Sequence, residues 1–207
     1  MKIKVILYCI FLVSLSSCTF IIKKWAGIKN PKLESIHSIN HYANKKGIDT
    51  SMFIFSKDSA SLFKLNNMFS SFPEILVFDK QKKFIPYKND SSTCNGPVDN
   101  TLKGICNISS NNFLSTKKIL YDSLLNCIID PNKCLKSFDI KDVDYVVFVN
   151  FQKNFPRLIR THIVPWNAVI KANNANCKVK YIYVDLDYLK KWGISKKSLP
   201  KYRFNIF

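Results

Sequence analysis

Glycine is scarce in this chain of 207 residues, which contains only five. Loops that cradle phosphate groups need closely spaced glycines, because a backbone without side chains can approach the ligand. The strained turn that carries the nucleophile of many serine hydrolases also depends on glycine. The sequence contains neither pattern, so nothing in it indicates a nucleotide-binding enzyme or a serine hydrolase.

Acidic residues and arginine are scarce as well. Fourteen aspartates and glutamates stand against 32 lysines and arginines, which gives a net charge of +18, but only three of the basic residues are arginines. Arginine is the residue that binds phosphate and base edges through paired hydrogen bonds, so a nucleic-acid partner is not expected. The lysine clusters at 23–32 and 190–203 are either an ordinary solvated surface or are attracted to anionic lipid.

The first 18 residues are expected to form an export signal. Lys2 and Lys4 precede an apolar run over residues 5–15, which has the length of a signal-peptide core and is too short to cross a bilayer. The segment Leu15-Ser16-Ser17-Cys18 resembles the lipobox of bacterial lipoproteins. The resemblance implies that residues 1–17 are removed, that Cys18 carries the lipid, and that the protein faces the periplasm or the cell exterior from the inner or the outer membrane. The alternative is a short uncleaved anchor, since residues 5–22 carry no charge.

The remaining residues are expected to form an α/β fold. Hydrophobic residues make up 47% of the chain and aromatic residues 14%, which is enough for a packed core of one domain or two small ones. We expect a tether over residues 18–32 and a divergent α/β half over residues 33–139. Within that half, periodicity predicts helices at 33–46, 58–69 and 115–128, strands at 52–55, 74–79 and 84–87, and a loop over 88–112.

Residues 140–207 show the clearest order of elements. An apolar strand is predicted at 145–149, a helix that Pro165 interrupts follows it, and a second strand is predicted at 179–184. This order resembles the thioredoxin fold, in which a cis-proline then opens the next strand. The resemblance implies a thioredoxin-like mixed sheet flanked by helices, with Pro200 as the candidate cis-proline. Pro73, which precedes the predicted hairpin, is a second candidate, so the two halves form either one sheet or two.

The redox centre of that family is missing from the sequence. In thioredoxins the kinked helix opens with Cys-x-x-Cys, and the family spacing counted back from Pro165 puts Arg157 and Arg160 at these positions. Disulfide exchange needs a thiolate, and no Cys-x-x-Cys occurs anywhere in the chain. We therefore expect a redox-inactive scaffold. Beside the positive end of the helix dipole, the two guanidiniums form either an anion-binding patch or an ordinary solvated surface.

Five further cysteines follow Cys18, and an exported protein can form disulfides with them. They are Cys94, Cys106, Cys127, Cys134 and Cys177. We expect Cys94 to pair with Cys106 across a turn-rich loop and Cys127 to pair with Cys134 around a helix end, which leaves Cys177 as a free thiol. Other pairings stay open, because spacing alone does not determine connectivity.

A metal site is not expected. His37 and His41 have the spacing of metal ligands on one helix face, and Glu34 is expected to share that face. The solvent face of a helix is, however, where such residues usually lie, and no further ligand is evident. No other cofactor is indicated.

Two groups of aspartates border the predicted strands of the last third. One group enters the first strand at Asp139, Asp142 and Asp144, and the other, Asp185 and Asp187, leaves the second strand. In a parallel pair these groups lie at opposite edges, about 20 Å apart, so they cannot form one acid–base site. We expect both groups to be solvated.

The sequence therefore predicts a membrane-anchored, redox-inactive thioredoxin-like lipoprotein that acts without catalysis. It would serve as a binding or structural module for an envelope protein that the sequence does not identify. The alternatives are a thiol-disulfide oxidoreductase with a non-standard cysteine pair and a protein that binds anionic membrane surfaces.

Overall fold

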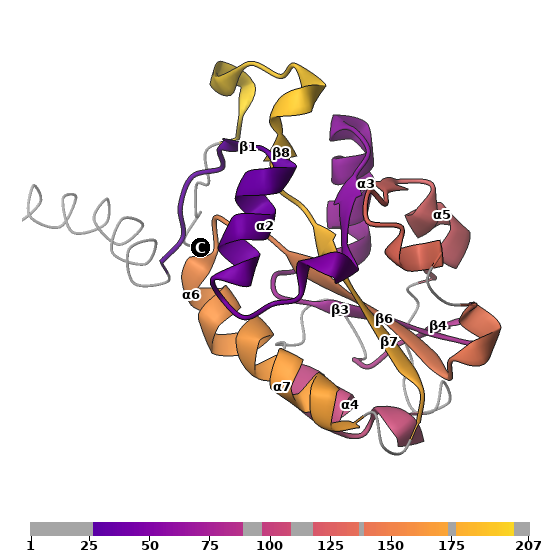
Figure 1. Cartoon of the computed structure of the whole chain (residues 1–207). Helices are drawn as coiled ribbons and strands as arrows, with labels where there is room; N and C mark the ends of the chain where they lie inside the picture. Colours follow the sequence, from indigo (N-terminus) through magenta and orange to yellow (C-terminus); the bar gives the residue numbers. More distant parts are fainter. Residues whose placement is uncertain (1–26, 89–96, 109–117, 137–138, 174–176, 201–207) are drawn as a thin grey trace, which may run out of the picture.

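A mixed β-sheet lies between two layers of helices (Figure 1). The computed structural model describes residues 27–88, 97–108, 118–136, 139–173 and 177–200. The expected signal peptide, Cys18 and Cys94 therefore lie outside the described residues. The six-stranded sheet has the order β4-β3-β6-β7-β2-β5, and a separate short sheet pairs β1 with β8.

The strands are β1 (Leu33–Glu34), β2 (Phe53–Ser56), β3 (Ile75–Asp79), β4 (Phe84–Ile85), β5 (Ile128–Ile129), β6 (Tyr145–Phe151), β7 (Val179–Asp185) and β8 (Tyr188–Leu189). The helices are α2 (Ile36–Asn44), α3 (Ser59–Phe69), α4 (Pro97–Lys103), α5 (Tyr121–Leu125), α6 (Pro156–Leu158) and α7 (Val164–Asn173). Short helical turns are η1 (Thr50–Met52), η2 (Ile105–Asn107), η4 (Cys134–Lys136), η5 (Ile140–Asp142), η6 (Ile159–Ile163), η7 (Lys190–Trp192) and η8 (Lys196–Ser198).

The parallel pair β6 and β7 forms the centre of the sheet. Its register runs from Tyr145 opposite Val179 to Phe151 opposite Asp185, so the predicted strand–helix–strand unit is confirmed. Alternate side chains of β6 point to opposite faces. Val147 and Val149 pack in the core beneath α2, α4 and α7, while the side chains of the other face pack against α3 and α5. Burial on both faces explains why β6 is a continuous apolar run.

Helix capping explains where α2 and α3 begin. The Asp58 carboxylate accepts the Ser61 amide N–H at 2.7 Å, so α3 starts where the sequence predicts. The Ser35 hydroxyl accepts the Ser38 amide N–H at 3.1 Å and starts α2. The predicted helix at 33–46 is therefore too long, because the two residues before Ser35 form β1 instead.

Pro165 interrupts the helix between β6 and β7, as the sequence predicts. Between α6 and α7 the chain makes a wide π turn, in which the Val164 amide N–H donates to the Ile159 carbonyl five residues back. Proline has no N–H and cannot continue the regular ladder. Within the turn, the Arg157 carbonyl accepts a hydrogen bond from the Thr161 hydroxyl at 3.0 Å.

Both halves of the chain contribute to one sheet. Strands β2 to β5 come from residues 33–139, and β3 pairs with β6 in the antiparallel direction. The Phe72–Pro73 bond before β3 is the one cis peptide bond among the described residues, so the expectation for Pro200 is wrong. The physical reason is that the β3–β4 hairpin, from the earlier part of the chain, already occupies the position next to β6. The strand that the cis-proline opens thus precedes the strand–helix–strand unit in the sequence, the reverse of the thioredoxin order.

Two other predictions are wrong in detail. The expected loop at 88–112 contains α4, which buries Val98 and Leu102 in the core beside α7. The helix expected at 115–128 is only five residues long within the described part, because Ile128 and Ile129 pair with β2 as the edge strand β5. None of the helices in the described part of the chain combines the length and the apolar character that crossing a bilayer requires.

Candidate functional site

The candidate site lies at the edge of the sheet where β6 and β7 end. Ligands of open α/β sheets bind outside the carboxyl ends of parallel strands. Phe151 at the end of β6 lies opposite Asp185 at the end of β7, and Ile75 at the start of β3 pairs with Val149 at the same edge. This edge therefore brings together the start of α6, the cis-proline segment and the residues that follow β7.

Arginines occupy the start of the helix that follows β6. Arg157 lies in the first turn of α6, directly after Pro156, and Arg160 follows three residues later in η6. Both side chains are exposed. Gly27 has a φ of +66°, and a Cβ added to it would lie 3.0 Å from the Arg157 Cβ. Residue 27 is therefore held close against the first turn of α6.

The cis-proline segment contacts the same helix start. The rings of Phe72 and Phe155 stack with their centroids 4.7 Å apart, and Phe155 is the residue that caps α6. The Phe72–Pro73 bond and the first turn of α6, which carries Arg157, therefore lie at the same edge of the sheet.

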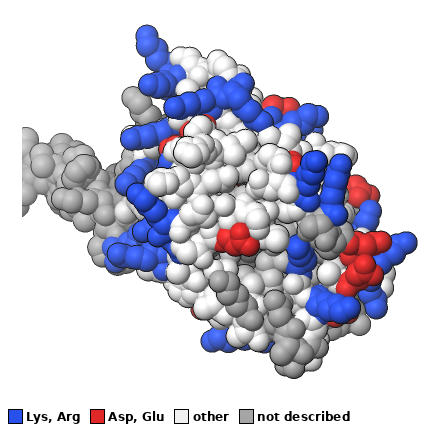
Figure 2. All heavy atoms as spheres, viewed as in Figure 1, with Lys and Arg blue, Asp and Glu red and all other residues white. Residues whose placement is uncertain are grey.

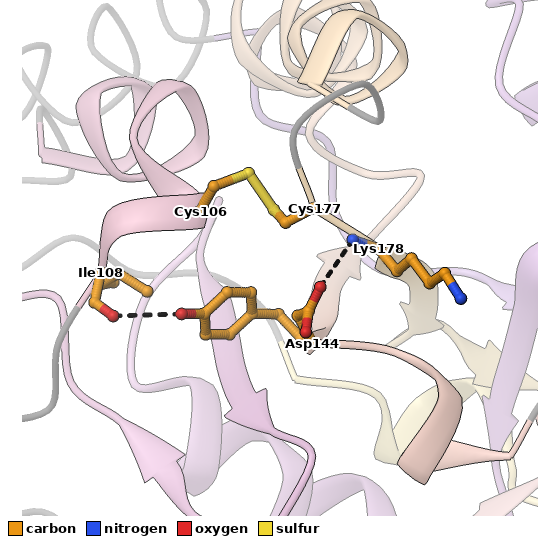
Figure 3. Close-up of a disulfide and its surroundings, with 6 residues drawn as sticks. Cys106, Ile108, Asp144, Cys177 and Lys178 are labelled. Atoms are coloured by element: carbon orange, nitrogen blue, oxygen red, sulfur yellow. Dashed lines mark hydrogen bonds between the residues drawn. A yellow bond between two sulfur atoms is a disulfide. The ribbon is translucent and has the colours of Figure 1, made fainter.

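The disulfide lies at the opposite edge of the sheet (Figure 3). It joins Cys106, after α4, to Cys177, before β7, with their Cα atoms 5.6 Å apart. Beside it the Lys178 amide N–H donates to Asp144 Oδ2 at 2.9 Å, one residue before β6 begins. Strand β6 has seven residues, so at 3.3 Å per residue the disulfide is about 20 Å from the start of α6.

The expected cysteine pairing is therefore wrong. Cys177, expected to be a free thiol, is the partner of Cys106, and neither Cys127 nor Cys134 is in a disulfide. Cys94 lies outside the described residues. The reason is that α4 packs on α7 and brings Cys106 next to the segment that follows α7, a tertiary contact that sequence spacing does not reveal.

The two remaining thiols are buried between the sheet and the layer formed by α3 and α5. Burial raises the pKa of Cys127. Burial also raises the pKa of Cys134 to about 12, and the Asp130 carboxylate adds to this shift. Because the thiolate is the reactive form, neither side chain is suited to attack a disulfide at neutral pH.

Asp185 and Asp187 are buried, so the expectation that they are solvated is wrong. They are 0% and 3% exposed. Burial raises the pKa of both carboxyls, and Glu34 of β1 lies close enough to raise both pKa values further. Asp187 Oδ2 accepts the Lys153 amide N–H at 2.9 Å, and the Asp187 amide N–H donates to Asp185 Oδ2 at 3.3 Å. In the part of the chain that the structure describes, Asp185 Oδ1 has no hydrogen-bond partner. The expectation that this pair and Asp144 lie at opposite edges is confirmed.

Lys153 links the loop after β6 to the start of α2. Its Nζ lies 2.7 Å from Glu34 Oε2 and donates to Ser38 Oγ at 2.7 Å, and the Ser38 hydroxyl donates to Glu34 Oε2 at 2.8 Å. Glu34 is in β1 rather than on the helix face of His37 and His41. Among the described residues, no group of three candidate ligands could hold a metal ion.

Lys153, Glu34 and Asp187 line an open pocket of about 220 Å³. Its walls carry Lys29, Lys32 and Lys153 together with the carboxylates of Glu34 and Asp187, and the rest of its lining is neutral. Positive and negative groups are thus present in similar number. The pocket offers hydrogen bonds to a polar group but has no clear preference for an anion or a cation.

A buried ion pair lies on the β3 side of the same edge. Glu74, directly after Pro73, has its Oε1 atom 2.8 Å from Lys88 Nζ, and the two side chains are only 2% and 8% exposed. Glu74 Oε2 accepts the amide N–H and the hydroxyl of Ser71 at 2.9 and 2.6 Å. The Asn150 side chain accepts the Glu74 amide N–H and donates to the Ser71 carbonyl, both at 2.7 Å. These bonds attach the cis-proline turn to β6.

The aspartate pair predicts that stability depends on pH. Burial and the neighbouring Asp187 raise the pKa of Asp185 well above its usual range, and burial raises the pKa of Asp187 to about 6. A carboxyl with a raised pKa binds its proton more tightly in the folded state, so the stability it provides is present below about pH 4 and is lost as the pH rises through about 6. We expect urea denaturation to show the free energy of unfolding falling as the pH rises, by about 3 kcal/mol from Asp187 alone, with a further contribution from Asp185.

Asp185→Asn should flatten this slope and make the protein more stable at neutral pH, because the buried pair then carries one ionisable group instead of two. Asp142→Asn is the matched control, since Asp142 is exposed near the opposite edge. An Asp185→Asn variant with the slope of the unmodified protein would show that the pair is not its source.

Sequence reasoning missed every buried charge at this edge. Glu74 and Asp185 each adjoin or end an apolar strand, and this was the available signal. The same pattern is common where a strand simply reaches solvent, so the residues that cover the edge had to be known. Those residues include β1, which is distant from Asp185 in the sequence, and Lys88, which lies beyond the β3–β4 hairpin from Glu74.

Comparison of the chain with protein-family models, with curated proteins and with solved structures finds no match. The geometry of this edge of the sheet is therefore the basis on which a function can be proposed.

Proposed function

We propose that this chain is a redox-inactive thioredoxin-like module, anchored to a bacterial membrane by a lipid on Cys18, that presents a binding surface in the cell envelope. One observation carries the proposal: the helix that starts beside the cis-proline has arginines near its start and no cysteine there. Arg157 lies in the first turn of α6, and Arg160 lies three residues later.

The chemistry of disulfide exchange supports a role without catalysis. Exchange needs an attacking thiolate and a second thiol that resolves the mixed disulfide. A guanidinium stays protonated and can do neither. The disulfide between Cys106 and Cys177 is about 20 Å away at the other edge. The thiols of Cys127 and Cys134 have raised pKa values on the far side of the sheet.

The proposed anchor rests on the lipobox-like residues 15–18, which lie outside the described residues. Mass spectrometry of the N-terminal peptide from membrane-extracted protein tests it. We expect a peptide that begins at Cys18 and carries acyl chains, and we expect Cys18→Ser to abolish the modification. A mature protein that retains residues 1–17 would contradict the anchor.

An insulin-reduction assay tests the proposed lack of redox activity. We expect the unmodified protein to match the uncatalysed rate. The variant Arg157→Cys/Arg160→Cys should form a reducible disulfide and gain activity, on the order of tenfold over that rate, because cysteines three residues apart in a helical turn have the separation that a disulfide needs.

The matched control is His41→Cys/Asn44→Cys, which places the same spacing within α2 and away from the cis-proline. This variant should form a bridge without gaining comparable activity. Activity in the unmodified protein that Cys127→Ala or Cys134→Ala removes would overturn the proposal and favour an oxidoreductase with a non-standard cysteine pair.

A further inference from the structure

The structure brings two lysine-rich segments together at one edge of the molecule. Strands β1 and β8 pair in parallel, with Leu33 opposite Tyr188 and Glu34 opposite Leu189. One segment precedes β1 and the other follows β8 through η7 and η8. We name their six exposed lysines the basic edge: Lys29, Lys32, Lys190, Lys191, Lys196 and Lys197. Figure 2 shows lysine and arginine side chains, both in blue, at the upper end of the molecule and along the adjoining side.

The acidic residues of the same two segments are turned away from solvent. Within residues 27–36 and 185–200 the acids are Glu34, Asp185 and Asp187. Glu34 is paired with Lys153 and is 15% exposed, and the two aspartates are buried. The exposed charge of these segments is therefore of one sign.

We propose that the basic edge docks the protein on an anionic lipid surface. The proposal rests on the lipid anchor of the proposed function. Nine peptide links separate Cys18 from Gly27, where the described chain begins, so this end of the molecule lies within about 30 Å of the bilayer. Lys29 and Lys32 of the basic edge follow Gly27 closely in the chain, so the proposed anchor keeps them within reach of the lipid headgroups.

Lysine side chains suit a lipid surface better than a nucleic acid. None of the six residues is an arginine, and lysine acts as a point charge rather than as a paired hydrogen-bond donor. Near an anionic leaflet each lysine strengthens binding about fivefold, which is the factor that corresponds to about 1 kcal/mol.

The association should be electrostatic rather than an insertion into the bilayer. Trp192 is the aromatic residue of η7, and its indole N–H donates to the Lys57 carbonyl at 3.0 Å. Its ring also packs against Tyr188. Since these contacts hold Trp192 against the body of the protein, the lysines provide the attraction, and salt should weaken it.

The test uses the mature chain from residue 18 with Cys18→Ser, so that no lipid contributes to binding. Removing residues 1–17 takes nothing from the hydrophobic core, because both core clusters consist of residues between Ile36 and Trp192. We therefore expect the shortened chain to fold. Sedimentation with vesicles of neutral phosphatidylcholine, alone or mixed with anionic phosphatidylglycerol, measures the partition. We expect binding to the mixed vesicles at low salt, and its loss near 1 M salt, where the Debye length is about 3 Å.

Variants locate the binding surface. Replacing Lys190, Lys191, Lys196 and Lys197 with glutamine should weaken the partition more than a hundredfold, at about fivefold per lysine. The control carries the same loss of charge on other elements, at Lys103, Lys118, Lys136 and Lys141, which are all exposed. The control should bind nearly as well as the parent, and thermal unfolding should confirm that both variants are folded.

Equal losses in the two variants, equal binding to neutral vesicles, binding that ignores salt, or tighter binding to a DNA duplex than to anionic vesicles would each overturn the docking proposal. The N-terminal mass measurement decides the lipid anchor independently. An unlipidated Cys18 with intact vesicle binding would refute the anchor alone, and a lipidated Cys18 without salt-sensitive vesicle binding would refute the basic edge alone.

Discussion

Replacing Glu74 with alanine should lower the free energy of unfolding by about 3 to 5 kcal/mol. The change leaves the Lys88 ammonium buried without its counter-charge, since the two side chains lie 2.8 Å apart and are almost completely covered. It also removes the acceptor of the Ser71 amide and hydroxyl, which hold the cis-proline turn. Urea denaturation monitored by far-ultraviolet circular dichroism measures the effect.

A matched control comes from the exposed pair of Lys82 and Asp122, which lie 3.2 Å apart with side chains 45% and 73% exposed. Asp122→Ala should change stability by no more than about 1 kcal/mol, because solvent screens exposed pairs. If Glu74→Ala prevents folding altogether, the double variant Glu74→Leu/Lys88→Met keeps the prediction testable. It removes both charges and should recover most of the lost stability. A Glu74→Ala variant as stable as Asp122→Ala would contradict the assigned role.

Removing the disulfide should lower the free energy of unfolding by about 4 kcal/mol, as expected for a bridge that closes a loop of this length. The bridge joins residues 71 apart and connects the segment after α4 to the start of β7 (Figure 3). The double variant Cys106→Ser/Cys177→Ser should therefore denature at a clearly lower urea concentration. Reductant should produce the same loss in the unmodified protein.

The control compares the Cys106→Ser/Cys177→Ser variant with and without reductant. Its free energy of unfolding should be the same in both conditions, because it has no Cys106–Cys177 bridge to reduce. Cys127→Ala/Cys134→Ala should keep the sensitivity to reductant, since these thiols are not in a disulfide. The prediction fails if the double serine variant loses further stability on reduction, or if alkylation of the unreduced protein labels Cys106 or Cys177.

The proposed binding edge combines the cis-proline turn with the start of a helix. The cis bond before Pro73, the stacked rings of Phe72 and Phe155, and the first turn of α6 lie together. The buried ion pair of Glu74 and Lys88 lies on one side of it and the buried Asp185 and Asp187 lie on the other. Their hydrogen bonds to Ser71 and to the Lys153 amide attach the neighbouring loops to this edge.

Local patterns predicted the elements whose signals are contained within a few residues. The apolar run of β6, the Asp58 cap of α3 and the interruption at Pro165 were each predicted, because hydrophobic periodicity, capping and a missing N–H act over one or two helical turns. The helix expected through Ile128 failed because pairing with β2 outweighs local helix preference at Ile128 and Ile129.

Composition and short-range spacing were enough to predict the α/β class and the parallel strand–helix–strand unit, since both are properties of the chain alone. Three features came from the three-dimensional packing instead: Cys106 pairs with Cys177, Pro73 rather than Pro200 is cis, and Glu74 and Asp185 are buried. Each of these depends on which distant segments pack against one another. Such contacts arise from burial of the whole core, and no short stretch of sequence contains them.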